Sequence, residues 1–126
     1  MKSKHYSSYA TPTLRIGIAL VFLWFGINQL FDTSSWVAWL PEWCLHLPMQ
    51  PVTFVLINGF LETGLGFLLL LGKWTRVVAL LLSLHLFGIA FSVGYNDVMI
   101  RDLGLALATL SIALHGPDQY CLDTNK

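Results

Sequence analysis

Four long apolar segments constrain this chain more than any other feature of its sequence. A helix needs roughly 20 mainly apolar residues to cross about 30 Å of hydrocarbon. The segments of about this length cover residues 14–30, 52–71, 77–93 and 100–114, the last being the shortest. Because lipid cannot satisfy the edges of an open sheet, and the chain is short for a closed barrel, strands are unfavourable. The sequence therefore predicts an all-α integral membrane four-helix bundle, formed by a single domain over residues 1–126.

The composition agrees with a protein that is surrounded by lipid. Charged residues make up 11% of the chain and hydrophobic residues 56%, whereas a soluble domain has about 25% charged residues. The formal net charge is zero, so nothing indicates nucleic-acid binding. We find no glycine-rich phosphate loop and no cysteine cluster for a metal, and we predict no metal site.

The basic residues predict an orientation, because Lys and Arg gather in the cytoplasmic loops of membrane proteins. In the predicted topology, six of the seven lie on one side: Lys2, Lys4, Arg15, Lys73, Arg76 and Lys126. Arg101 alone lies on the other side. We therefore expect both termini in the cytoplasm and a multi-pass protein of the cytoplasmic (inner) membrane.

Glu62 is the most informative polar residue within the apolar segments. Ionisable groups inside the membrane are costly and usually face the bundle interior. Asn58 lies one helical turn before Glu62, and Gly66 continues the same face, so that a helix or a ligand can approach it. His85 should lie at a similar depth on the next helix, and we expect it to contact Glu62. Two interpretations stay open: hydrogen bonds that only hold helices together, or a proton relay or ligand site with Glu62 and His85 as its candidate catalytic residues.

Further polar residues gather near the outer ends of the helices. Asn28 and Gln29 lie there on the first helix, and Arg101 and Asp102 begin the fourth. With Asn58, Glu62 and His85 they are candidates to line a polar, ligand-binding pocket that opens outward. Alternatively, Arg101 and Asp102 pair with each other or with lipid headgroups.

Arg15 has a different position, at the inner end of the first helix. Its long side chain can extend to the cytoplasmic surface while its charge stays in water, which is the interpretation we favour. The alternative is a clamp on Asp118 or Asp123 of the C-terminal tail.

The first outer loop contains three tryptophans at helical spacing, Trp36, Trp39 and Trp43. We expect a short helix that Ser34 or Ser35 caps and that Pro41 ends. Indole rings favour the headgroup layer, so an interfacial helix is the simpler interpretation. A lid over an outward-facing cavity is the alternative.

The order of several short motifs resembles the DoxX family of small membrane proteins. These motifs are Leu-Arg-Ile-Gly at 14–17, Phe-Gly at 25–26, Glu62 with Gly66, Leu-Leu-Gly-Lys-Trp-Thr-Arg at 70–76, Arg-Asp-Leu-Gly at 101–104 and Gly-Pro-Asp-Gln-Tyr-Cys-Leu-Asp at 116–123. In the last motif, Asp118 stands where the family often has Gly, and Cys121 where Ser is common. The resemblance covers residues 14–123 and implies a four-helix membrane bundle.

The resemblance also implies a function. DoxD, a relative of the family, is a subunit of an oxidoreductase that passes electrons from thiosulfate to a membrane quinone. We therefore expect a quinone-binding, redox-linked subunit, with a membrane quinone as cofactor and a soluble or membrane redox partner. Glu62, His85, Asn58 and Arg101 would serve the quinone carbonyls and supply protons.

Two other functions stay open. One is a non-catalytic membrane module that binds lipid or anchors a soluble partner, so the residues leave open whether the chain takes part in an enzyme. The other is a small proton-coupled transporter of the multidrug-resistance type. That class carries its membrane-embedded Glu on the first helix, whereas Glu62 lies on the second, which argues against it.

The predicted topology can be tested with reporters fused to the two ends. We expect both fusions to report the cytoplasm, because six of seven basic residues lie on that side. Reporters that placed the ends in different compartments would contradict the four-helix topology.

Overall fold

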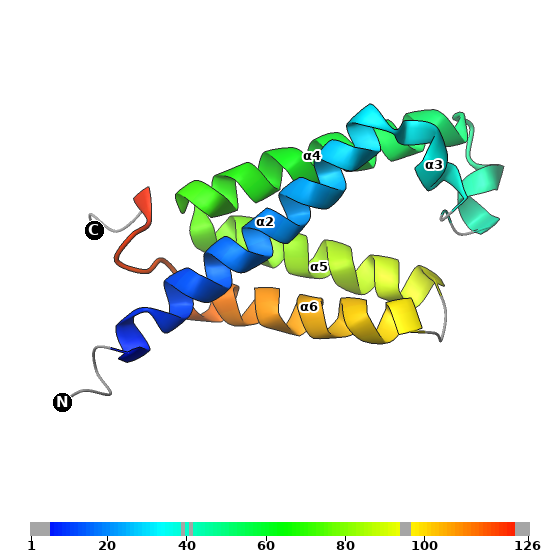
Figure 1. Cartoon of the computed structure of the whole chain (residues 1–126). Coiled ribbons are helices and arrows are strands. Elements are labelled where there is room, and N and C mark those ends of the chain that lie inside the picture. Colours follow the sequence, from blue (N-terminus) through cyan, green and yellow to red (C-terminus); the bar gives the residue numbers. More distant parts are fainter. Residues whose placement is uncertain (1–5, 39, 41, 94–96, 123–126) are drawn as a thin grey trace.

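The computed structural model describes residues 6–38, 40, 42–93 and 97–122, and within these ranges it contains helices and no strand. Four long helices, α2 (Ala10–Phe31), α4 (Pro51–Leu71), α5 (Thr75–Val93) and α6 (Asp97–His115), are each long and apolar enough to cross a membrane (Figure 1). The all-α, four-helix prediction is confirmed. α4 begins one residue earlier than predicted, at Pro51. The other three helices begin two to four residues earlier, since their first turns include polar residues that an apolar segment does not reveal.

Glycine and proline set several helix ends. Pro51 occupies the first turn of α4, where its missing N–H costs nothing. At the other end, Gly72 has a left-handed backbone (φ 76°), and its N–H donates to the carbonyls of Leu68 and Leu69. Gly116, directly after α6, is also left-handed (φ 84°).

The helices are arranged as two antiparallel pairs. α2 packs mainly against α4, and α5 packs mainly against α6, with fewer contacts between the pairs. In Figure 1 the two pairs lie close together at the end that carries both chain termini and diverge toward the opposite end. We call these the termini end and the loop end.

Glycines allow α2 and α4 to approach each other closely. A Cβ atom on Gly26 would lie 2.7 Å from the backbone nitrogen of Thr63 and 3.0 Å from the carbonyl oxygen of Gly59. A Cβ atom on Gly66 would lie 3.1 Å from the Cβ of Phe22. The prediction that Gly66 admits a close neighbour is therefore confirmed, and that neighbour is α2.

The apolar core joins the two pairs. It contains Ile18, Ala19 and Phe22 from α2, Leu69 from α4, Val78, Ala79, Leu82 and Leu86 from α5, and Ala106, Ile112 and Ala113 from α6. Large apolar side chains also cover the outer faces, among them Trp24, Phe60 and Leu107. Such a surface is unusual for a soluble protein and suits helices that face lipid.

The loop after α2 forms two short helices, α3 (Thr33–Val37) and the 3-10 helix η1 (Glu42–His46). The prediction of a Ser34 or Ser35 cap is wrong, because α3 begins earlier and Asp32 occupies the cap position without a side-chain bond. Trp39 and Pro41 lie outside the described residues.

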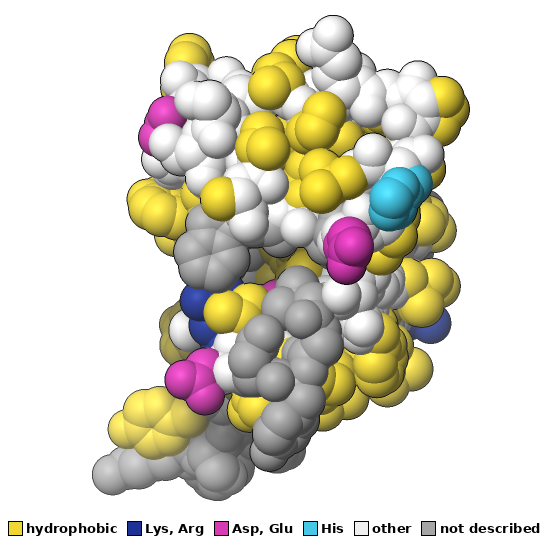
Figure 2. All heavy atoms as spheres, turned by 90° about the vertical axis from the view of Figure 1, so that its right-hand side faces the viewer, with side chains coloured by type: hydrophobic (Ala, Val, Ile, Leu, Met, Phe, Trp, Pro, Cys, Tyr) yellow, Lys and Arg dark blue, Asp and Glu magenta, His cyan; other side chains and the backbone are white. Residues whose placement is uncertain are grey.

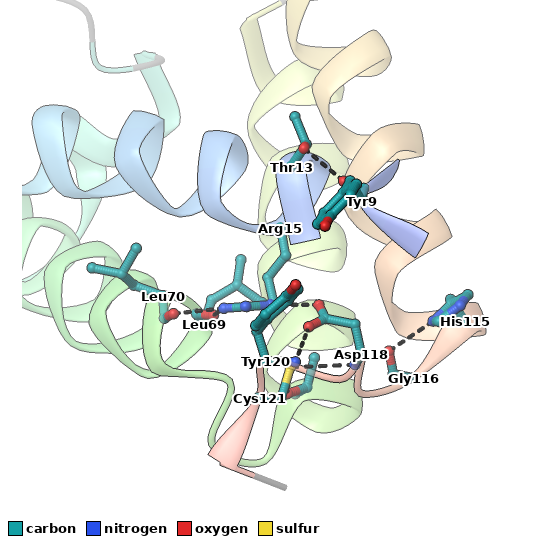
Figure 3. A network of polar contacts seen from close by, with 11 residues as sticks. Tyr9, Thr13, Arg15, Leu69, Leu70, His115, Gly116, Asp118, Tyr120 and Cys121 are labelled. Atoms are coloured by element: carbon teal, nitrogen blue, oxygen red, sulfur yellow. Dashed lines mark hydrogen bonds and ion pairs between the residues drawn. The ribbon is translucent and has the colours of Figure 1, made fainter. Parts of the chain in front are cut away.

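Arg15 is the main polar tie at the termini end. Its side chain is buried, with 1% of the residue exposed. Its Nε donates to Asp118 Oδ2 at 2.8 Å, and its Nη1 donates to the carbonyl oxygens of Leu69 (3.0 Å) and Leu70 (2.5 Å) (Figure 3). The favoured interpretation, in which Arg15 extends to the surface, is therefore wrong, and the alternative clamp on Asp118 is confirmed. The reason is that buried carbonyls at the end of α4 and a tail carboxylate satisfy the guanidinium better than a bilayer surface would.

The tail continues from this ion pair across the turn between α4 and α5. Asp118 Oδ1 accepts a hydrogen bond from the Tyr120 N–H at 2.9 Å, and the Cys121 N–H donates to the Asp118 carbonyl. Cys121 Sγ in turn accepts from the Thr75 hydroxyl at 3.5 Å. Only a glycine fits at position 72, because a Cβ there would overlap Cys121. The tail thereby connects α2 and α4 with the ends of α5 and α6.

The glycine contact between α2 and α4 predicts that one added methyl group lowers the stability of the protein at Gly26 but not at Gly17. Gly26→Ala should destabilise the protein by roughly 1–3 kcal/mol, because the added methyl group would overlap the Thr63 side chain and would also meet backbone atoms of Thr63 and Gly59 that cannot move aside. Gly17→Ala, on the same helix but with nothing within 4 Å, should be neutral or slightly stabilising. Unfolding in detergent measures both, and equal stability of the two variants would contradict the close crossing.

The buried ion pair predicts a pH-dependent stability. Burial raises the pKa of the Asp118 carboxyl, but hydrogen bonds from Arg15 and Tyr120 outweigh it and hold that pKa below its ordinary value. The carboxyl group therefore contributes fully to the free energy of unfolding above about pH 3.9, its pKa in the unfolded chain. This contribution is lost as the pH falls through the lower pKa of the folded protein.

Asp118→Asn should accordingly cost about 3–5 kcal/mol at neutral pH, because it leaves the Arg15 charge buried without its partner. Thermal unfolding of both proteins across the acid range is the measurement. The difference between them should shrink below about pH 4, and a difference that stays constant into strong acid would contradict this assignment.

Candidate functional site

A cavity of about 400 Å³ lies between the two helix pairs toward the loop end. This volume falls in the range of small-molecule sites. Figure 2 shows the loop end face-on, with a hollow between two groups of side chains. The apolar lining includes Val21, Phe25, Trp36, Leu40, Trp43, Phe54, Val55, Leu84, Ile89, Val98 and Leu105, and the polar lining includes Gln29, Asn58, Glu62, His85, Ser92, Arg101 and Asp102.

A chain of hydrogen bonds runs along the cavity wall from Asn58 to His85. Asn58 Nδ2 donates to Gln29 Oε1 at 2.7 Å, and Gln29 Nε2 donates to Glu62 Oε1 at 2.8 Å. The second carboxyl oxygen of Glu62 lies 3.1 Å from His85 Nε2. Four side chains from α2, α4 and α5 therefore form one continuous network, and the expected contact between Glu62 and His85 is present.

Helix geometry explains why these four side chains meet. Asn58 and Glu62 are four residues apart on α4 and share one face. Gln29 reaches between them because Gly59 brings α2 close: a Cβ on Gly59 would lie 3.1 Å from the Gln29 Cβ. His85 then approaches from α5, whose start is joined to the end of α4 by a short turn.

The network satisfies a carboxyl group that is almost completely buried. Glu62 is 4% exposed, and a charged group in such a place requires hydrogen-bond partners. Gln29 donates to one oxygen, and His85 can donate Nε2–H to the other. His85 is less buried than Glu62, and both side chains line the cavity. A contact between a carboxyl group and an imidazole at a cavity wall can exchange protons with a ligand.

Arg101 and Asp102 line the cavity from α6. Arg101 Nε lies 3.6 Å from Asp102 Oδ1, and the guanidinium carbon lies 5.9 Å from the centre of the Phe25 ring. Asp102 is buried, whereas more than half of the Arg101 side chain is exposed. The two residues therefore pair with each other and also line the cavity, as both interpretations of them proposed.

Asn28 is the candidate that the structure does not bring to the cavity. Its Nδ2 donates to the Trp24 carbonyl at 2.7 Å, one turn back on its own helix, and Asn28 is not part of the cavity wall. Gln29, the next residue along α2, points into the network instead.

Aromatic side chains join the loop to the cavity wall, and sequence reasoning missed two of them. Trp36 packs edge-on against Phe25 of α2, with ring centres 5.7 Å apart, and Trp43 packs edge-on against Phe54 of α4 at 6.0 Å. The two residues that the sequence analysis missed are Phe25 and Phe54. Helical spacing could have indicated them, because Phe25 lies four residues before Gln29 and Phe54 lies four residues before Asn58. Among the described residues of this loop, the cavity lining includes Trp36, Leu40, Trp43 and Cys44.

Cys44 of η1 also lines the cavity and is 1% exposed. Burial raises the pKa of its thiol, which makes it less reactive than a free cysteine at neutral pH. Within the part of the chain that the structure describes, no three His, Cys, Asp or Glu side chains form a possible metal site.

The sequence model of one family, DoxX, matches residues 10–94. The chain belongs to the DoxX family. The match covers more than half of the chain and includes α2, α4 and α5, so that Gln29, Asn58, Glu62 and His85 lie inside it. Residues 101–123, with Arg101, Asp102 and Asp118, lie beyond it. No curated protein and no solved structure matches the chain. With four apolar helices and this family, the protein is an integral membrane protein.

Proposed function

We propose that this DoxX protein binds a membrane quinone in the cavity, as the membrane subunit of a redox complex. The observation that carries the proposal is the network from Asn58 to His85, which ends in a buried carboxyl–imidazole contact at the wall of a mainly apolar cavity. Such a wall combines surface for an apolar ring with groups that can exchange protons.

The residues present fit a quinone headgroup. Phe25, Trp36, Trp43 and Phe54 provide flat apolar surface for a ring. His85 and Arg101 line the cavity from different helices and can each donate a hydrogen bond to a carbonyl oxygen. The size of the cavity suits a small ring with part of its apolar chain.

Each polar residue then has a distinct task. A bound quinone supplies the capacity to take up two electrons and two protons. Glu62 holds a proton next to His85, and His85 transfers protons between Glu62 and the ligand. Gln29 and Asn58 fix the orientation of the Glu62 carboxyl group, and Arg101 offers positive charge near a carbonyl oxygen.

The proposal assigns the supply of electrons to a soluble or membrane partner subunit, since the sequence carries no flavin, haem or iron–sulfur motif. It also places the protein in the cytoplasmic (inner) membrane with both termini in the cytoplasm. This orientation rests on the distribution of Lys and Arg. The cavity would then open toward the outer side of the membrane.

The proposal predicts that a quinone copurifies with the protein in mild detergent, where mass spectrometry of an organic extract detects it. In a reconstituted assay with its partner, Glu62→Gln should lower quinone turnover by roughly 100-fold or more, because the variant cannot hold the transferred proton. Asn28→Ala is the matched control, since Asn28 lies outside the cavity wall. Normal turnover of Glu62→Gln, or copurification of phospholipid without quinone, would favour a non-catalytic lipid-binding module instead.

A further inference from the structure

The cavity is bordered by two seams between the helix pairs, and the structure closes them differently. At the seam between α2 and α6, the Arg101 guanidinium lies over the Phe25 ring. At the seam between α4 and α5, the cavity wall includes Leu84 and Gly88. These two residues are also exposed on the outer surface, where 58% of Leu84 is accessible.

The position of Gly88 on α5 follows from its neighbours. His85, three residues earlier, turns toward Glu62 of α4. Ser83, on another side of the helix, donates to the Ala106 carbonyl of α6. At about 100° per residue, Gly88 lies on the side of His85 that points away from α6. Gly88 therefore lies at the lipid-facing edge of the α4–α5 seam.

The missing side chain of Gly88 leaves this edge open. A Cβ atom added there would meet nothing within 4 Å, so close helix packing does not explain the glycine. Gly88 and Leu84 thus belong at once to the cavity wall and to the outer, lipid-facing surface of the protein.

We propose that Gly88 and Leu84 form a lateral entrance, through which a ligand dissolved in the bilayer reaches the cavity between α4 and α5. This inference rests on the proposed function only in that the same cavity receives the ligand. The ligand class is an amphipathic molecule whose ring or headgroup passes into the cavity while its apolar chain stays in the seam. Such a molecule partitions into the membrane and need not cross the water layer at the loop end.

Cys44 offers a reporter for this route that does not depend on quinone. It lines the cavity and is almost inaccessible from outside, so a thiol reagent that reaches it must have entered the cavity. The second cysteine, Cys121, is removed by Cys121→Ser. Because burial raises the pKa of the Cys44 thiol, labelling is measured at moderately alkaline pH, where more of the thiolate is present.

The experiment compares labelling of Cys44 in the full-length Cys121→Ser protein in lipid vesicles. The reagents are pyrenyl maleimide, which partitions into the bilayer, and a sulfonated maleimide, which stays in water. Gly88→Trp and, independently, Leu84→Trp should each slow labelling by the pyrenyl reagent several-fold. Gly88→Ala should label at the unmodified rate, since a methyl group leaves the space open.

Gly104→Trp is the matched control. Gly104 is an exposed glycine of α6 with nothing within 4 Å, but it is not part of the cavity wall. Its variant should label normally, as should every folded variant with the sulfonated reagent. Circular dichroism and thermal melting establish that each variant is folded.

Unchanged labelling by the pyrenyl reagent in either folded tryptophan variant, Gly88→Trp or Leu84→Trp, would overturn the lateral entrance, and so would equal slowing in Gly104→Trp. The test of the entrance is independent of the test for quinone binding. If the entrance is found but no quinone binds, the route stands and the cavity takes another bilayer-dissolved ligand. If quinone binds but the entrance is absent, the ligand enters from the loop end.

Discussion

The buried positive charge of Arg15 is the constraint on which this structure depends. Arg15 has too little contact with water to be solvated by it, so protein groups must satisfy its guanidinium. They come from two distant parts of the chain, the last carbonyls of α4 and the carboxylate of Asp118. Since those groups belong to different helix pairs, satisfying one side chain fixes how the pairs meet.

The cavity follows from this one-sided closure. At the termini end, the tail and the apolar core hold the pairs together, whereas toward the loop end they diverge (Figure 1). The contact between Glu62 and His85 crosses the gap at an intermediate depth and limits how far the pairs separate. Space for a ligand therefore lies beyond this contact, with ionisable groups at its inner wall.

The four long helices and most of the polar residues of the cavity wall could be predicted from the sequence. Both follow from the geometry of each helix considered separately. The spacing of Asn58 and Glu62, and equal depth for His85, required only regular geometry. The burial of Arg15 could not be predicted from one helix, since it depends on a carboxylate of the tail, far away in the sequence. The sequence alone could not show whether Asn28 or Gln29 faces the cavity. The rotation of α2 about its axis, set by Gly26 and Gly59, determines that it is Gln29. The positions of the short loop helices also depend on contacts with other helices, since Trp36 packs against Phe25 and Trp43 packs against Phe54.

The Arg15–Asp118 pair has a consequence for the order in which the protein assembles. The two residues are 103 positions apart, so the ribosome makes all four long helices before it adds the carboxylate. Until then, the first helix carries a cation without its final counter-ion, and long basic side chains in this situation remain near the polar headgroups. The native surroundings of Arg15 are thus complete only after the residues that follow α6 have been synthesised.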